Sequence, residues 1–376
     1  MRGKAVIAGV GHTIYGKHPG RDRISLIVEA CRNALQDAGI EKDMVDGVLV
    51  KMANSEPSIL YGQKVAEALG LQPRVGASLD QGGAANIALI SYAAMAVDAG
   101  LMDIALVCYG DTPRTGSRQV YHRPRGDDAV FGWYATAAGY AMIHQAYAQK
   151  HACRPEHFGA VAVQCRANGA ENPQGHLNKP ITLDDYMESP LLIEPLRRDD
   201  CCLISDGGAA VVVMSAERAK QLGIANAVPV LGFGQGQESW DVHLRPNLTE
   251  TSAAASADTA FKMAGLEPGN IDVAQLYDCF TVTVLLTLED YGLAKRGQAG
   301  PMAAQGALAL DGSLPLNTSG GLLSESGTPG LQLVIEGVRQ MRGDARLQIE
   351  GAKTCIVSNQ GGSMHTHATM ILGNPS

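Results

Sequence analysis

The chain has 376 residues, of which 45% are hydrophobic, 18% charged and 5% aromatic, and its formal net charge is −8 at pH 7. This length allows one large domain or two fused ones, and the negative charge argues against a nucleic-acid partner, which would need a concentrated basic surface. No apolar run approaches the length of a membrane span and no signal peptide is visible, so we expect a cytoplasmic protein that does not contact a membrane. The eight cysteines match neither a zinc pattern nor a disulfide framework and are expected to be reduced.

The first part of the chain alternates between predicted strands and helices. An apolar strand ending in glycines is expected at 5–11, and the segment 30–50 predicts an amphipathic helix, a short acidic loop and an apolar strand. A second helix follows Gly82 and Gly83, and the strand 104–110 follows that helix. Alternating strands and helices are typical of parallel strands covered on both faces, so we expect an α/β protein.

A polar segment interrupts this pattern before it starts again. Residues 111–204 are rich in Pro, Arg and Asp, which indicates an inserted loop region, and a fully buried strand is expected at 205–215. The pattern then resumes with an apolar strand at 228–234 and with a helix, a loop and a strand over 256–276. Another glycine-rich turn, a helix and the strand 354–362 follow.

The two parts are similar in sequence as well as in pattern. Segments 30–50 and 256–276 can be laid over each other at a constant offset, and in both a glycine is expected to end the helix in a left-handed conformation. The identical pairs include Ala34 and Ala260, Ala38 and Ala264, Gly39 and Gly265, Glu41 and Glu267, and Asp46 and Asp272. We therefore predict an internal duplication, with an N-terminal half at 1–222 that contains the insert 111–204 and a C-terminal half at 223–376.

Four motifs carry a resemblance to a known family. They are SDGGAA at 205–210, YDCFT at 277–281, LNTSGG at 316–321 and CIVSNQGG at 355–362. With the duplication, they make nearly the whole chain resemble the thiolase superfamily, and within it the sterol carrier protein-type thiolases and the lipid-transfer-protein-type aldolases of steroid side-chain breakdown. The resemblance implies a thiolase fold, a five-layer αβαβα sandwich of two βαβ halves, with acyl-coenzyme A substrates and a homodimer. It also implies a small partner protein with an OB fold and a zinc ribbon.

Three positions depart from the family pattern. Gly82 stands where thiolases carry the nucleophilic cysteine, and Gly327 stands where they carry a histidine. Tyr277 stands where the sterol carrier-type enzymes carry another histidine. A glycine cannot form the thioester through which a thiolase exchanges acyl groups, so ordinary thiolysis is not expected.

The two glycines nevertheless suit a different reaction. Gly82 and Gly327 each precede the core helix of their half, and in the family fold both helix starts point at one cleft. Free N–H groups and positive helix ends there would stabilise an oxyanion or enolate, which favours retro-aldol cleavage of a β-hydroxyacyl-CoA. Tyr277 is the first candidate for the base that takes the alcohol proton, although Gly327 replaces the second tyrosine of the aldolase relatives. The alternative is a tyrosine packed at the sheet end with its hydroxyl bonded to the backbone.

Other residues are assigned to the same site. His365 could act as an acid–base group because histidine titrates near neutral pH, and its spacing from His367 predicts that both lie on one strand face; the alternative is a pair of ordinary surface histidines. Asp278 is a further catalytic candidate and could instead cap the helix that follows it. The positions expected to bind the oxyanion or the substrate are Asp80, Gln81, Gly82, Gly83, Gly327, Asn359 and Gly361.

An arginine-rich stretch of the insert is the candidate for holding coenzyme A. Arg114, Arg118 and Arg123 could contact its phosphates, or could instead pair with Asp127 and Asp128. Coenzyme A is expected as part of the substrate thioester and not as a resident cofactor. No nucleotide redox cofactor is expected, because the glycine-containing turn after the first strand lacks the third glycine of a dinucleotide site, and no metal is expected because no ligand set is evident.

Three functions are compatible with this sequence. The first is an acyl-CoA lyase of the aldolase type that works without a cysteine. The second is an acyltransferase, resembling acetyl-CoA acetyltransferase, in which another residue or a partner chain supplies the nucleophile. The third is a non-catalytic subunit that binds acyl-CoA within a complex.

Overall fold

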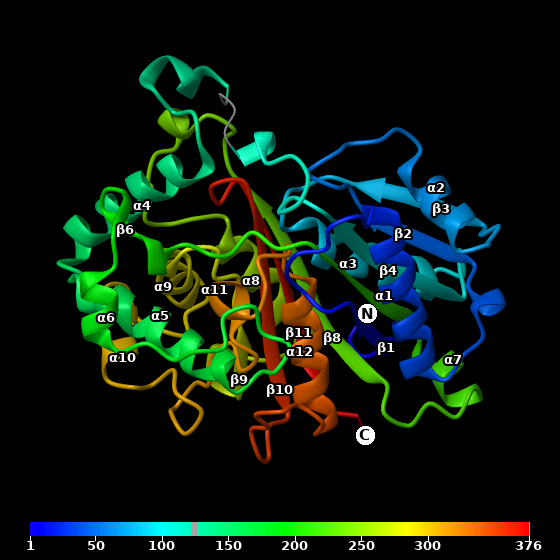
Figure 1. Ribbon diagram of the computed structural model, residues 1–376. Helices are drawn as coiled ribbons and strands as arrows, with labels where there is room; N and C mark the ends of the chain where they lie inside the picture. The colour runs from blue at the N-terminus through cyan, green and yellow to red at the C-terminus, as the bar shows by residue number, and fades with distance from the viewer. Residues whose placement is uncertain (122–125, 376) are drawn as a thin grey trace.

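The strands of both halves join in one sheet. The computed structural model describes residues 1–121 and 126–375, and in these residues the long sheet has nine strands in the order β3-β2-β4-β7-β1-β8-β11-β10-β9 (Figure 1). The N-terminal half supplies β1 (Ala5–His12), β2 (Gly47–Lys51), β3 (Val75–Leu79), β4 (Ile104–Asp111) and β7 (Gly207–Ser215). The C-terminal half supplies β8 (Val228–Gln237), β9 (Val273–Gln275), β10 (Thr354–Gly361) and β11 (Thr366–Gly373). The halves meet where β1 pairs with β8, Val6 opposite Pro229 and Ile7 opposite Val228.

Helices cover both faces of each half of the sheet. On one face of the N-terminal strands lie α1 (Arg23–Ala38) and α2 (Tyr61–Ala68), while α8 (Ala253–Ala264) packs on β8 and β11. The helices α3 (Ala85–Asp98) and α12 (Leu331–Arg342) contact strands of both halves and share one core with them. They therefore form a middle layer between the two half-sheets, and the predicted αβαβα sandwich is confirmed.

The duplication is visible element by element. The unit β1–α1–β2 corresponds to β8–α8–β9, and α1 ends at Gly39 with φ +67° while α8 ends at Gly265 with φ +61°. Both glycines lie in the left-handed region that other residues rarely adopt. In each half a parallel pair, β2 with β4 or β9 with β10, is followed by an antiparallel neighbour, β7 or β11. The two halves therefore share one strand order.

The insert 111–204 is largely helical, so its interpretation as a loop region was wrong. It contains α4 (Thr136–His151), α5 (Pro155–Ala170), α6 (Leu183–Glu188) and a hairpin of β5 (Leu191–Ile193) and β6 (Leu196–Arg197). Both long helices are rich in alanine, the strongest helix former. The polar stretches on either side of them dominate the composition of the whole segment and hide this signal.

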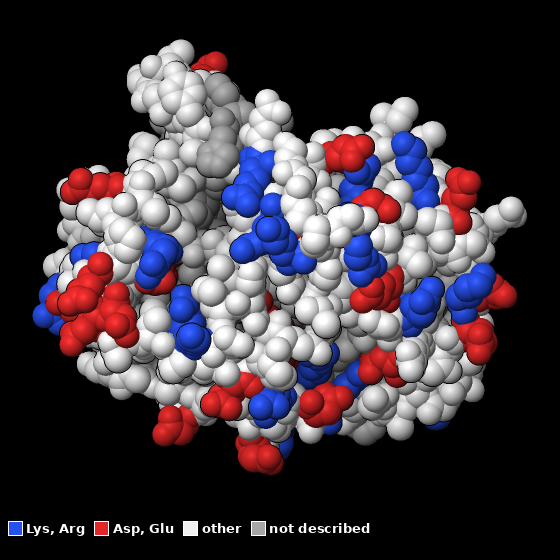
Figure 2. Space-filling model, viewed as in Figure 1, with Lys and Arg blue, Asp and Glu red and all other residues white. Residues whose placement is uncertain are grey.

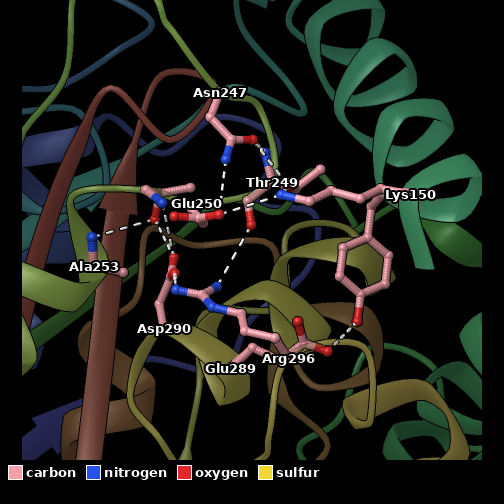
Figure 3. Close-up of polar contacts among 10 residues, drawn as sticks. Lys150, Asn247, Thr249, Glu250, Ala253, Glu289, Asp290 and Arg296 are labelled. Carbon is pink, nitrogen blue, oxygen red and sulfur yellow. Dashed lines mark hydrogen bonds and ion pairs between the residues drawn. The ribbon is translucent and has the colours of Figure 1, made fainter.

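A polar network holds the insert against the C-terminal half (Figure 3). Lys150 of α4 donates to Thr249 Oγ1 at 2.8 Å and to Glu250 at 3.2 Å. Arg296 forms an ion pair of 2.6 Å with Asp290, whose side chain is fully buried, at the end of α9 (Thr281–Asp290). The buried carboxylate of Asp290 is therefore paired with a cation and not left as an isolated charge.

The surface carries mixed charges. Acidic and basic side chains are interspersed over the face in Figure 2, and a group of Lys and Arg side chains lies near its upper centre. Within residues 1–121 and 126–375, no helix is both long enough and apolar enough to cross a membrane.

Candidate active site

A cavity of about 880 Å³ is lined by residues of both halves. Its walls come from the loop between β3 and α3, the residues after β9, the turn between β10 and β11, and the insert. The predicted site residues that line it are Asp80, Gln81, Gly82, Gly83, Tyr277, Gly327, Gly361 and His365. Residues distant in the sequence therefore meet beyond the carboxyl ends of β3 and β10, where α/β proteins commonly form their sites.

The start of α3 is closed by residues of the C-terminal half. A side chain at Gly83 would collide with the Gln360 carbonyl oxygen and with the phenol of Tyr277, whose Cζ lies 2.7 Å from the position of a Cβ. This contact requires glycine at position 83. The phenol of Tyr277 thus fills the space beside the first residues of the helix.

The position of the missing nucleophile is equally crowded. Gly82 has φ +57°, a left-handed conformation that favours glycine, and a Cβ there would lie 2.8 Å from Gly361 Cα. The Gly82 N–H donates to Asp80 Oδ1 at 3.0 Å, and the Gln81 carbonyl accepts from Thr366 Oγ1 at 2.8 Å. These contacts hold the loop before α3 against the β10–β11 turn, so a cysteine at position 82 would require both segments to move.

The start of α12 is closed by the insert instead. A Cβ on Gly327 would collide with the Leu203 carbonyl and would lie 3.0 Å from Ile204 N. The Gly327 N–H donates to Ser205 Oγ at 3.1 Å, and this hydroxyl contacts His176 Nδ1 at 3.0 Å. A histidine or a second tyrosine at position 327 would therefore displace the main chain of the insert.

Tyr277 lies in the cavity wall and is only 8% exposed. Burial raises the pKa of its phenol well above the ordinary value, and the nearby thiols of Cys279 and Cys202 act in the same direction. The Tyr277 N–H donates to Ser358 Oγ at 2.9 Å, which fixes the backbone. The phenol is therefore protonated at neutral pH, and it can give a proton more readily than it can act as a free phenolate base.

The two histidines occupy different elements. His365 lies in the turn before β11, where its Nδ1 accepts from the Ser363 N–H at 2.7 Å and its Nε2 donates to the Trp240 carbonyl at 2.6 Å. His367 lies within β11, contacts the Tyr291 hydroxyl at 2.7 Å, and has its pKa lowered to about 3 by burial. The expectation that they share one strand face was wrong, because the turn ends after His365. Of the pair, His365 lines the cavity.

Asp278 and Asn359 lie behind the cavity wall. The carboxylate of Asp278 is fully buried and accepts from the Leu322 N–H at 2.7 Å and the Leu323 N–H at 3.1 Å. It therefore caps α11 (Gly321–Ser324), not the helix that follows it in sequence. Asn359 is buried against Gly330 at the start of α12, where its amide can donate to the Gly330 carbonyl at 3.2 Å. Both support helix starts, and neither lines the cavity.

Three cysteines line the cavity: Cys201, Cys202 and Cys279. Burial raises the pKa of Cys201 and of Cys279 to about 12, and the pKa of Cys202 well above its usual value. A thiol attacks a thioester only as the thiolate. At neutral pH these cysteines are therefore not activated nucleophiles.

Neither Arg114 nor Arg118 lines the cavity. Arg114 is half-buried and donates to the Ile204 carbonyl at 3.2 Å, and the exposed Arg118 donates to the Arg114 carbonyl at 3.2 Å. Arg123 lies outside the described residues. Of the two predicted acidic partners, Asp128 pairs with His243 at 2.8 Å, and the Asp127 N–H donates to Asp241.

Several cavity residues were not found by sequence reasoning. They are Asn54, Tyr121, Tyr140, Glu238, Trp240 and Gln360. Gln360 could have been identified, because it lies between two residues that were assigned to the site, Asn359 and Gly361. The others lie in helices and loops that only the folded chain brings to the cavity.

Known proteins resemble this chain in sequence and in fold. Residues 234–374 match the family model described as thiolase C-terminal domain-like. The chain is 34% identical to a 17-hydroxy-3-oxo-4-pregnene-20-carboxyl-CoA lyase of Mycobacterium tuberculosis, over 95% of this chain and 96% of that relative. It is 31% identical to an acetyl-CoA acetyltransferase of Methanothermobacter thermautotrophicus, over 99% of each chain. A solved structure described as the Ltp2-ChsH2(DUF35) aldolase superposes with a TM-score of 0.90 and 33% identity, over 100% of this chain and 98% of that one. As its motifs predicted, the chain belongs to the thiolase superfamily.

Proposed function

We propose that the protein is an acyl-CoA lyase that cleaves a β-hydroxyacyl-CoA by a retro-aldol reaction without a cysteine nucleophile. The observation that carries this proposal is the buried phenol of Tyr277, packed against Gly83 next to position 82, where a thiolase would hold its reactive thiol. The named activity of the 34% identical lyase supports the same reaction class.

The reaction can be written with Tyr277 as a proton relay. In one concerted step, the Tyr277 oxygen takes the hydroxyl proton of the substrate as the phenol gives its own proton to the α-carbon, so that the phenol stays neutral. In the same step a carbonyl forms at the β-carbon and the bond between the α- and β-carbons breaks. The electron pair of that bond develops enolate character in the thioester, which peptide N–H groups at the start of α3 would stabilise. The products are a ketone or aldehyde and a shortened acyl-CoA, and no oxidant is needed.

The cavity wall favours a bulky apolar substrate. Hydrophobic side chains from the insert and the C-terminal half form much of it, including Leu192, Ile193, Leu196, Leu203, Phe280 and Leu322. A cavity of about 880 Å³ is much larger than an acetyl group needs. We propose that the carbonyl product is a large apolar ring system, as in the substrate named for the lyase relative.

The test is direct. Purified protein is incubated with a bulky 3-hydroxyacyl-CoA, and the free carbonyl compound and the shortened CoA ester are measured by mass spectrometry. We expect both products in equal amounts without added free coenzyme A. Cleavage of a 3-oxoacyl-CoA that requires free coenzyme A would instead identify a thiolase.

An acyltransferase is the second candidate, because three cysteines line the cavity and one relative is named as an acetyl-CoA acetyltransferase. This function requires an acyl group on the enzyme. Intact-protein mass spectrometry after incubation with acetyl-CoA would detect it. A non-catalytic acyl-CoA-binding subunit, the third candidate, would bind the ester without forming product.

We further propose a cytoplasmic homodimer that works with a small OB-fold, zinc-ribbon partner and holds the coenzyme A phosphates near Arg114, Arg118 and Arg123. The name of the superposed aldolase structure includes a DUF35 component, which supports a partner protein. Light scattering measures the dimer, and co-purification followed by mass spectrometry identifies the partner. Replacing Arg114 and Arg118 by Ala should raise the KM for the CoA ester more than it lowers kcat.

A further inference from the structure

Gln360 lies in the cavity wall and carries a buried, unpaired acceptor atom. This residue lies near the end of β10, is 1% exposed and lines the cavity. Its Oε1 has no hydrogen-bond partner among the described residues, although the atom is buried. An unpaired buried carbonyl is unfavourable, so this oxygen favours a bound group that can donate a hydrogen bond.

The neighbours of Gln360 fix which end of its amide is paired within the protein. Its Nε2 lies 3.3 Å from the Cys279 sulfur, and the Cys279 thiol also contacts the hydroxyls of Tyr140 and Thr283. Those hydroxyl hydrogens are already used, because Tyr140 donates to the Gly362 carbonyl at 2.8 Å and Thr283 donates to main-chain carbonyls. The thiol hydrogen must therefore point to a hydroxyl oxygen, which leaves the sulfur to accept from Nε2. This arrangement turns Oε1 away from Cys279.

The same residue lies beside the proposed proton relay. The main-chain carbonyl oxygen of Gln360 and the phenol of Tyr277 both lie where a Cβ on Gly83 would reach, and Tyr277 and Gln360 share the cavity wall. A substrate hydroxyl between them can accept a hydrogen bond from the phenol and donate one to Oε1. A ketone at the same carbon has no proton to donate, and it would leave Oε1 unpaired beside a second acceptor.

We propose that Gln360 determines specificity by accepting a hydrogen bond from the 3-hydroxyl of the substrate, so that the cavity selects 3-hydroxyacyl-CoA over 3-oxoacyl-CoA. This inference rests on the proposed lyase function and names the residue that distinguishes its substrate from that of a thiolase. In the bound complex the 3-hydroxyl of the substrate donates to Gln360. For cleavage, the hydroxyl rotates so that its proton points at the Tyr277 oxygen. The carbonyl product has no such donor, which favours its release.

The test is equilibrium binding, which does not depend on turnover. Calorimetry measures the dissociation constants of a 3-hydroxyacyl-CoA, its 3-oxo counterpart and its saturated counterpart. The protein used is the Tyr277→Phe variant, in which cleavage is blocked. We expect the hydroxy ester to bind at least about tenfold more tightly than the oxo ester. Gln360→Met should reduce this ratio to about one. In otherwise unchanged protein, Gln360→Met should raise KM more than it lowers kcat.

Two controls keep the result unambiguous. Leu322→Met changes another cavity residue without a polar group, so it should leave the binding ratio unchanged. Gln360→Glu keeps an acceptor oxygen, so it should retain a preference for the hydroxy ester if the methionine variant fails to fold. Equal binding of the hydroxy and oxo esters to Tyr277→Phe protein, or an unchanged ratio in Gln360→Met, overturns the inference. Tighter binding of the hydroxy ester than of the oxo ester, in a protein whose unchanged form cleaves neither, would reject the lyase function but not the recognition by Gln360.

Discussion

The starts of α3 and α12 occupy equivalent places in the two halves, and both lack the side chain that the family uses for chemistry. At α3, the missing side chain is that of Gly82, whose Cβ position is crowded by Gly361, and the phenol of Tyr277 fills the space beside the next residue, Gly83. At α12, the space beside Gly327 is filled by the main chain at Leu203. The start of α3 has therefore gained a neighbouring group that can transfer a proton, whereas the start of α12 is walled off by main chain.

This asymmetry explains how a duplicated fold can keep one reactive centre. A thiolase-type reaction needs groups at both helix starts, namely a nucleophile at one and an acid–base group at the other. A retro-aldol reaction needs one proton relay and a place for the enolate. The α3 start can supply both, so the α12 start is left to shape the cavity.

Removal of the Tyr277 hydroxyl should give the largest effect. Tyr277→Phe keeps the ring against Gly83 but removes the atom that moves the proton, so kcat should fall by about 10²–10⁴-fold. The KM should change much less, because the wall of the cavity is retained. Steady-state cleavage of a 3-hydroxyacyl-CoA measures both constants, and circular dichroism checks the fold. A variant that keeps more than half of the kcat would remove Tyr277 from the mechanism.

A matched pair of glycine variants tests the asymmetry itself. Gly83→Ala pushes on the phenol and should lower kcat by about tenfold or more, whereas Gly327→Ala pushes on the main chain of the insert and should mainly raise KM. Each should also lower the free energy of unfolding by about 1–3 kcal/mol, because both positions are overpacked by the new methyl group. Kinetics and urea denaturation of the two variants give the comparison. Equal losses of kcat would show that both helix starts take part in the chemistry.

The cavity cysteines should contribute little to the chemistry. Cys201→Ala is expected to keep kcat within about threefold of the unchanged protein, because a thiol whose pKa is raised to about 12 is not a thiolate at neutral pH. Iodoacetamide at pH 7 should label Cys201 slowly for the same reason. Mass spectrometry follows the labelling, and the product assay follows the activity. A covalent acyl group on Cys201, Cys202 or Cys279 would contradict the cysteine-independent reaction.

The fold could be predicted from the sequence because the repeated signals are local. The glycines that end α1 and α8, and the buried strands around them, can each be recognised within a short stretch of sequence. The helices of the insert were missed, because α4 and α5 carry their signal in alanine content within a polar segment.

The site was predictable only where motifs reach it. The family motifs located Gly82, Tyr277 and Gly327, which line one cavity. They did not reveal that Asp278 points at the main chain of α11 or that the amide of Gln360 contacts Cys279, since both contacts depend on side-chain direction in the folded chain. Contacts such as that of Gly327 with Leu203 depend on how the insert folds back, which no local pattern encodes.

The smallest expected effect concerns the support of the α12 start. Glu325 is buried two residues before Gly327, accepts from Ser319 Oγ at 2.7 Å and from Asn172 Nδ2 at 3.3 Å, and has its pKa raised to about 8 by burial. Between about pH 4.5 and pH 8 the folded protein therefore holds a proton that the unfolded chain has released, so this group makes the free energy of unfolding fall as pH rises through that window. Glu325→Gln removes the titration, and the decline in urea midpoint from pH 5 to pH 8 should be smaller than in the unchanged protein. The kcat at pH 7 should stay within about twofold of the unchanged protein, because the α12 start shapes the cavity wall and does not react. An identical pH dependence of the urea midpoint in both proteins would mean that Glu325 is ionised in the folded state.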